Sequence, residues 1–195
     1  EIPDIISECE KAGNPNLVYE FASTSKVSFP GSGIAAMATS AENLADVKKQ
    51  MTIQTIGYDK LNQLRHVAYF KNIDGLKAHM KKHADAMRPK FEAVLKVLDE
   101  ELTGAEIGSW VKPLGGYFIS FDALEGCAKK IVAKCKEAGV TLTNAGATFP
   151  YGKDPKDSNI RIAPSFPTPE EMAVATDLFV LCVKLVSVEK LLENK

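Results

Sequence analysis

The stretch ASTSKVSFPGSGIAA, residues 22–36, places one lysine between two apolar segments and just before a turn rich in glycine. Residues 16–23 and 33–40 on its two sides are rich in apolar and β-forming side chains, which predicts two strands. Pro30 and the glycines around it predict a chain reversal between them. A solvated lysine needs no such setting, so Lys26 is a candidate for chemistry.

One interpretation of this lysine is acyl transfer. Ser23 and Lys26 have the S-x-x-K spacing of penicillin-binding enzymes, in which the lysine assists a serine nucleophile. Those enzymes also carry S-D-N and K-T-G elements, and neither tripeptide occurs in this sequence. Their serine also opens a helix, whereas the segment 27–33 contains proline and glycine and is not predicted to be helical. The sequence therefore gives acyl transfer little support.

A second interpretation is imine chemistry, and a third is an ordinary exposed lysine at the end of a strand. A lysine in a partly apolar pocket loses ammonium character, because burial disfavours the charged form, and its free amine attacks aldehydes. Pyridoxal phosphate is the aldehyde cofactor that uses such a lysine. Ser23, Ser25 and the backbone N–H groups near residues 31–33 offer donors for its phosphate. Imine formation at Lys26 is the hypothesis that accounts for the setting.

The bulk properties of the chain are those of a soluble globular protein. Its 195 residues suit one large domain, or one domain with part of another, and 45% of them are hydrophobic. A net charge of −1 predicts neither a nucleic-acid partner nor an acidic membrane partner. Four cysteines without a CxxC pair predict reduced thiols and a cytoplasmic location.

Apolar periodicity and turn residues outline the rest of the chain. Helices are predicted at residues 2–13, 41–56, 58–102 with a break near 71–75, 127–139 and 168–194. Strands are predicted within 108–123, at 140–145 and at 159–165. Ser40 is expected to cap the helix at 41–56. Pro89 is expected to kink or divide the long helix at 58–102. Thr168 and Glu171 are expected to form a capping box at the start of the helix at 168–194.

Four segments together resemble pyridoxal-phosphate-dependent aminotransferases of fold type I. ASTSKVSFPGSGIAA looks like their cofactor-lysine segment, and it is most similar to the divergent aspartate-aminotransferase-like subgroup related to MocR regulators. Residues 55–91, KPLGGYFISFD at 112–122 and NAGATFPYGKDPKDSNIRIAPSFP at 144–167 continue the match in the same order. The resemblance covers the whole chain but only the C-terminal half of such an enzyme.

The resemblance implies a mixed α/β and α+β fold, the C-terminal part of a pyridoxal-phosphate-dependent transferase. It divides the chain into a remnant of the large cofactor-binding domain at 1–70, a connecting helix at 71–102 and a small α+β domain at 103–195. Because residue 1 is glutamate and the first strand begins so early, we expect this chain to be a piece of a longer protein.

The same resemblance implies three roles for residues of this chain. Lys26 matches the lysine that forms a Schiff base with pyridoxal 5'-phosphate, and Ser23 matches a hydroxyl that contacts its phosphate; Ser25 offers a second hydroxyl nearby. Arg161 matches the arginine that binds the substrate α-carboxylate. Strand alternation also places Arg161 on the face opposite its two isoleucine neighbours, and a guanidinium suits bidentate capture of a carboxylate.

The sequence also departs from the family pattern. Many aminotransferases place a phosphate-binding arginine seven or eight residues after the lysine, where this chain has Gly33 and Ile34. Without this arginine, the cofactor phosphate would be bound by the hydroxyls of Ser23, Ser25, Ser28 or Ser32, or by residues outside the chain. The ring-stacking aromatic and the acid that pairs with the pyridine nitrogen lie upstream of the lysine in this family.

The function implied by the resemblance is amino-group transfer between an amino acid, with aspartate as the candidate, and a 2-oxo acid, by a cytoplasmic homodimer. No nucleic-acid or membrane partner is predicted. The alternative is a non-catalytic folding or dimerisation module derived from an aminotransferase or a MocR-like regulator.

His79 and His83 have a metal-compatible spacing, but Met80 stands where a zinc protease motif has glutamate, so a solvated face and no metal site are predicted.

Overall fold

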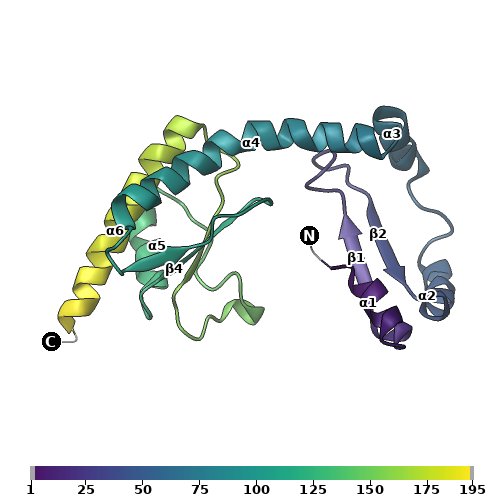
Figure 1. Cartoon of the computed structure of the whole chain (residues 1–195), viewed down its shortest axis with the longest axis horizontal. Coiled ribbons are helices and arrows are strands. Elements are labelled where there is room, and N and C mark those ends of the chain that lie inside the picture. The colour runs from purple at the N-terminus through teal and green to yellow at the C-terminus, as the bar shows by residue number, and fades with distance from the viewer. Residues whose placement is uncertain (1–2, 194–195) are drawn as a thin grey trace. The chain divides into compact units, whose positions relative to one another are not determined.

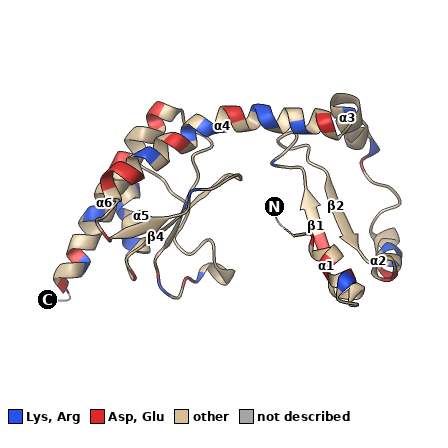
Figure 2. Cartoon of the chain, in the orientation of Figure 1, with Lys and Arg blue, Asp and Glu red and all other residues tan. Residues whose placement is uncertain are grey.

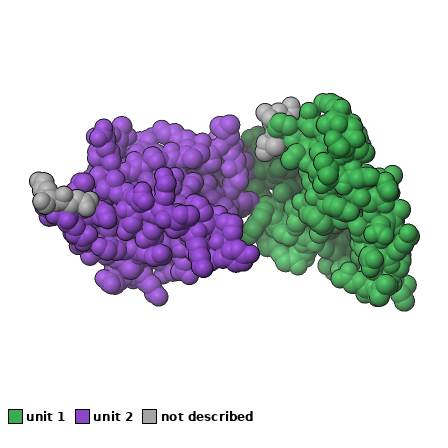
Figure 3. All heavy atoms as spheres, turned by 90° about the horizontal axis from the view of Figure 1, so that it is seen from below, with its two compact units in different colours: residues 1–83 green, residues 84–195 purple. Residues whose placement is uncertain are grey.

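The computed structural model describes residues 3–193, which fold as two compact units. Figure 3 colours the first unit, up to residue 83, and the second, from residue 84 onward. The predicted start of the first helix at residue 2 and the end of the last at residue 194 lie outside the described residues. The three-part domain division expected from the sequence stays a prediction.

The first unit begins with a short helix and a two-stranded ribbon (Figure 1). Helix α1 (Ile5–Lys11) and the 3-10 turn η1 (Pro15–Leu17) lead into strand β1 (Tyr19–Ser23), which pairs with β2 (Ala35–Thr39). The pairing is antiparallel, with Tyr19 opposite Thr39 and Ser23 opposite Ala35. Both predicted strands are confirmed, in shorter form, and the segment that carries Lys26 connects them.

The ribbon contains no buried residue. All five residues of β1 are exposed, and the Phe21 side chain has 73% of its surface accessible. Apolar strand faces are normally covered by another layer of the fold. The apolar side chains of this ribbon therefore form an exposed surface on which another polypeptide segment could pack.

Two helices complete the first unit. Helix α2 (Ala41–Gln54) is capped by Ser40, whose hydroxyl accepts a hydrogen bond from the Asn43 N–H at 3.2 Å, as expected. Helix α3 (Lys60–Phe70) follows, capped by Asp59, and buries His66 and Phe70. These two buried rings direct α3 toward the segment between the strands.

The long helix α4 (Ile73–Leu102) runs from the first unit into the second. It is separated from α3 by Lys71, whose backbone has a positive φ of 62°, so the predicted break near 71–75 is confirmed. Pro89 lies inside α4 without dividing it. The C-terminal half of α4 carries its buried residues, which belong to the core of the second unit.

The second unit is a three-stranded antiparallel sheet packed with helices. Strands β3 (Gly108–Trp110), β4 (Ile119–Ala123) and β5 (Asn159–Ile162) lie in the order β3-β4-β5. Helices α5 (Ala128–Glu137) and α6 (Pro169–Glu193) complete it. Phe121 is at the centre of the core, with its ring edge-to-face against Phe179 of α6 at 5.1 Å. The compact α+β character predicted for this part of the chain is confirmed.

One predicted strand is wrong. Residues 140–145 form no strand; they follow the end of α5 as irregular chain. Val140 instead donates its backbone N–H to the carbonyl of Cys135 at 2.8 Å, within a reversal at Gly139, whose φ is 94°. Apolar alternation alone could not distinguish this helix exit from a strand, because both carry Val and Leu at every second position.

Charges of both signs are distributed along the helices. Figure 2 shows positively and negatively charged residues interspersed along α4. None of the helices in residues 3–193 is long and apolar enough to cross a bilayer.

Candidate functional site

Lys26 lies in a tight turn directly after β1. Thr24 holds both ends of the Lys26 loop, which we define as residues 24–34. Its N–H donates to the carbonyl of Ile34 at 2.8 Å, and its Oγ1 accepts the N–H of Ile34 at 2.8 Å. The carbonyl of Thr24 also accepts the N–H groups of Val27 and Ser28, both at 2.8 Å. The backbone on both sides of Lys26 is thus fixed, while its side chain is exposed.

Two hydroxyls lie beside this turn. Ser23 Oγ and Ser25 Oγ are 2.7 Å apart, and Ser23 Oγ also accepts the Ser25 N–H at 3.2 Å. Both serines are exposed. Clustered hydroxyl and N–H donors are a common phosphate-binding arrangement. The two hydroxyls are therefore suited to binding an anion such as a phosphate group beside Lys26.

Ser28 has a different role from the one expected. Its side chain is 2% exposed, and its Oγ lies 2.7 Å from Nε2 of His66 and 2.9 Å from Oγ1 of Thr24. The hydroxyl is therefore hydrogen-bonded inside the loop. This arrangement does not leave it directed outward for a phosphate.

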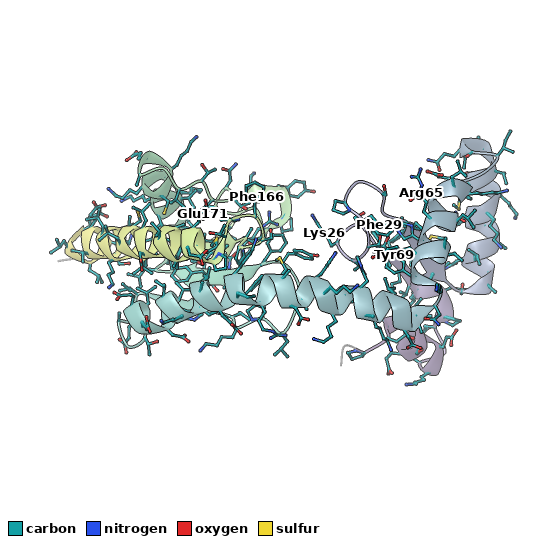
Figure 4. All side chains as sticks on the ribbon, turned by 90° about the horizontal axis from the view of Figure 1, so that it is seen from above. Lys26, Phe29, Arg65, Tyr69, Phe166 and Glu171 are labelled. Atoms are coloured by element: carbon teal, nitrogen blue, oxygen red, sulfur yellow. The ribbon has the colours of Figure 1, made fainter. Side chains whose placement is uncertain are left out.

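An aromatic cluster packs under the loop. Phe29 stacks on Phe70 with centroids 5.4 Å apart and meets the rings of His66 and Tyr69 edge-on, each at 5.2 Å. Figure 4 shows Phe29 beside Tyr69, with Lys26 on the same loop. His79 also packs on this cluster and is half-buried, so the predicted solvated face for this histidine is wrong.

An open groove adjoins the cluster. It has a volume of about 540 Å³, and its lining residues are Phe29, Ser32, Arg65, Ala68 and Tyr69. Ser32, a candidate phosphate ligand in the sequence, thus lies at this groove. No group of three or more metal-ligating side chains gathers anywhere in residues 3–193.

Arg161 lies on the central part of β5 in the second unit, opposite Ser120 of β4. Its guanidinium carbon is 4.4 Å from the centre of the Phe118 ring, which holds the planar group by a cation–π contact. Its Nε is buried and lacks a hydrogen-bond partner within the described chain. A buried guanidinium N–H without a partner is costly, so the side chain is prepared to donate to an anion.

The structure brings some of the predicted site residues together. Ser23, Ser25 and Lys26 form one local cluster in the first unit, whereas Arg161 belongs to the second unit. The sequence did not single out Thr24 or His66 as residues that fix the loop. The only sequence signal for His66 is a histidine on the apolar side of a predicted helix, which is more often a core residue than a functional one.

The sequence and the fold of the chain match one family of known proteins. The profile of the aspartate amino-transferase family matches residues 1–195. An aspartate aminotransferase of Corynebacterium glutamicum is 43% identical over 189 residues, which are 97% of this chain and 44% of that protein. The chain thus spans less than half the length of this relative.

Solved structures give the same result. The crystal structure of an aspartate transaminase from Corynebacterium glutamicum matches 97% of this chain and 45% of its own, with a TM-score of 0.94 at 43% identity. An α-aminoadipate aminotransferase from Thermus thermophilus, at 21% identity, matches 95% of this chain and 46% of its own with a TM-score of 0.74, and shares the fold.

These matches define the class as the pyridoxal-phosphate transferases of fold type I, of which the chain has a partial fold. Within that class, the chain belongs to the aspartate aminotransferase family.

Proposed function

We propose that this chain is the C-terminal half of a pyridoxal-phosphate-dependent aminotransferase, in which Lys26 binds the cofactor and Arg161 binds the substrate carboxylate. The observation that carries the proposal is the fixed turn at Lys26 beside the paired hydroxyls of Ser23 and Ser25. It occurs in a chain that is 43% identical to an aspartate aminotransferase.

The residues of the first unit fit the cofactor. The ε-amine of Lys26 would bind the aldehyde carbon, and the hydroxyls of Ser23 and Ser25 would donate to the phosphate oxygens. Pyridoxal phosphate, when bound, supplies an electron-withdrawing ring that stabilises negative charge at the substrate Cα. Lys26 would then take the proton from Cα and return it during amino transfer, as a general base and acid.

Arg161 fits the role of the carboxylate anchor. Its buried Nε lacks a partner in the described chain, and Phe118 holds the guanidinium plane. A planar, permanently charged fork binds a carboxylate through two parallel hydrogen bonds. The reaction would transfer an amino group between an amino acid and a 2-oxo acid, and aspartate is proposed from the names of the relatives.

A complete active site requires more than this chain. The relative from Corynebacterium glutamicum is more than twice as long, and the exposed ribbon of the first unit offers apolar surface for the remaining half to cover. The chain by itself is therefore expected to lack useful transaminase activity. A homodimer in the cytoplasm remains a prediction from the resemblance.

The proposal is tested in the full-length protein by borohydride reduction after loading with pyridoxal phosphate, followed by peptide mapping. We expect the pyridoxyl group on Lys26. In Lys26→Ala we expect both the pyridoxyl group and the transamination activity to be lost. Lys71→Ala is the matched control, because Lys71 is an exposed lysine of the same unit at the end of α3. A pyridoxyl group on another lysine would refute the assignment. Loading without any amino transfer would favour the alternative, a non-catalytic module derived from an aminotransferase.

A further inference from the structure

We propose that His66 is a positioning residue for Lys26, acting through the hydroxyls of Ser28 and Thr24. This inference rests on the proposed role of Lys26, and it assigns to α3 a part in the chemistry of the loop above it. His66 does not touch the lysine; it fixes the backbone from which the lysine projects.

A chain of hydrogen bonds runs from α3 to the loop. Nδ1 of His66 lies 2.8 Å from the carbonyl oxygen of Asn62, which can only accept, so Nδ1 carries a hydrogen. In the neutral ring Nε2 is therefore an acceptor, and the Ser28 hydroxyl donates to it at 2.7 Å. Ser28 Oγ also lies 2.9 Å from Thr24 Oγ1, which accepts the Ile34 N–H.

This chain is protected from water. Ser28 is 2% exposed and His66 is 8% exposed, so their hydrogen bond has little competition from solvent. Ser28 follows Lys26 by only two residues, and its N–H and that of Val27 donate to Thr24. A displacement of the Ser28 side chain would therefore move the turn that carries Lys26.

Two further side chains hold the same loop by its carbonyl groups. Asn62 Nδ2 donates to Ser32 O at 2.9 Å, and His79 Nε2 donates to Ser28 O at 3.1 Å. Together with His66 they form a polar platform, contributed by α3 and α4, beneath a loop that otherwise packs through the Phe29 ring. A loop held only for packing would not need three buried or half-buried polar anchors.

Substitution of His66 by glutamine or by asparagine distinguishes its hydrogen bond to Ser28 from its hydrogen bond to the Asn62 carbonyl. Glutamine is long enough to place its amide oxygen near the position of Nε2, so His66→Gln retains an acceptor for Ser28. Asparagine keeps an N–H near the position of Nδ1 but is too short for Ser28, so His66→Asn loses that acceptor. Ser28→Ala breaks the same bond from the other side. Phe70→Leu is the packing control, because Phe70 stacks on Phe29 and makes no side-chain hydrogen bond to the loop.

The first measurement is amide hydrogen exchange of the full chain without cofactor. His66→Asn and Ser28→Ala are expected to accelerate exchange at Val27, Ser28 and Ile34 by about tenfold, as loss of one ordinary hydrogen bond would. His66→Gln is expected to stay close to the parent chain. Phe70→Leu is expected to accelerate exchange throughout the first unit, without selecting the loop.

The second measurement uses the full-length protein loaded with pyridoxal phosphate. We expect His66→Asn to lower kcat and shift the absorbance maximum of the Lys26-bound cofactor, with rescue of both by His66→Gln and an unchanged maximum in Phe70→Leu. Unchanged kcat and absorbance in His66→Asn, with the pyridoxyl group on Lys26, would overturn the inference. So would equal effects of the asparagine, glutamine and leucine variants. A pyridoxyl group on another lysine would instead refute the proposed function, and with it the role of His66 toward Lys26.

Discussion

Gly33 lies so close to Ser25 that the space for a Cβ atom on Gly33 is already filled. A Cβ built there would be 2.8 Å from Ser25 Cα and 2.9 Å from Ser25 N, and it would also meet Ser25 Oγ. The backbone of the loop just before β2 thus approaches the turn next to Lys26 without a side chain between them. The close approach to Ser25 leaves no room for a side chain at Gly33, which is one of the two positions where the resemblance predicts a phosphate-binding arginine.

We expect Gly33→Ala to displace Ser25 and to destabilise the first unit by about 1–3 kcal/mol, the usual range for overpacking. The displacement should also disturb the pair of hydroxyls beside Lys26. Urea unfolding followed by circular dichroism measures the change. Gly57→Ala is the control, because nothing lies within 4 Å of its added Cβ. Equal effects of the two substitutions would contradict the close-approach argument.

We expect Arg161→Lys to raise the KM for both amino acid and 2-oxo acid in the full-length protein by about ten- to a hundredfold, because lysine keeps the charge but loses the two-pronged geometry. Binding of pyridoxal phosphate should change little. Steady-state kinetics with a cofactor titration distinguish these effects. Arg88→Lys, at an exposed position of α4, should leave the kinetics unchanged. A normal KM in Arg161→Lys would exclude the carboxylate role.

Many helices of this fold could be predicted because short local sequence signals determine where they begin and end. Ser40, Thr168 and the glycine after α5 each mark a helix end through chemistry within a few residues. The antiparallel pairing of β1 with β2 was not predicted, because it depends on contacts between separate segments. The strand expected at 140–145 failed for the same reason: only the sheet partners of a segment distinguish a strand from an extended loop.

The capping box of α6 provides a stability test. Thr168 Oγ1 accepts the Glu171 N–H at 3.2 Å, and Glu171 Oε2 accepts the Thr168 N–H at 2.8 Å, as the sequence predicted. Thr168→Ala is expected to cost about 1 kcal/mol. That corresponds to a decrease of about 4–8 °C in the melting temperature of a unit this size. Thr141→Ala, at an exposed position outside the helices and strands, should change it little. Equal melting temperatures for the parent chain and Thr168→Ala would contradict the cap.

The candidate site was predictable only in part. Lys26, Ser23 and Ser25 lie within four residues, so a short motif contains them. His66 follows Ser28 by 38 residues, and their hydrogen bond arises only when α3 packs under the loop. The sequence left Ser28 among the phosphate candidates because a hydroxyl that faces inward and one that faces outward have the same local pattern.

The cysteines should differ strongly in reactivity. Burial raises the pKa of Cys135 to about 12, with the adjacent Cys182 adding to the shift, and burial also raises the pKa of Cys127. Cys9, in contrast, is only half-buried. Because the thiolate is the nucleophile and Cys135 is buried with a raised pKa, iodoacetamide at pH 8 should alkylate Cys9 much faster than Cys135. Mass spectrometry of the digested protein measures the rates, and all four thiols should react in urea. Early labelling of Cys135 in the folded chain would contradict the buried arrangement.

Asp154 should give the loop before β5 a dependence on pH. Its carboxylate accepts the backbone N–H groups of Asn159 and Ser158 at 2.8 Å and that of Lys156 at 2.9 Å. These hydrogen bonds, that of Asn159 foremost, hold the pKa of Asp154 below its usual value, because they favour the charged form.

A depressed pKa means that Asp154 stabilises the loop fully at pH values above the ordinary aspartate pKa of about 3.9, and that this stabilisation is lost as the pH falls through the lower folded pKa. We expect the amide signals of Ser158 and Asn159 in nuclear magnetic resonance spectra to stay constant from neutral pH down to that ordinary value and to shift only below it. Asp154→Asn should abolish this transition, while Asp177→Asn, at an exposed position of α6, should leave it in place. A transition midpoint at or above the ordinary aspartate pKa would show that the three hydrogen bonds do not hold the carboxylate in solution. The loop leads directly into the strand that carries Arg161, so its opening in acid should also loosen the proposed carboxylate anchor.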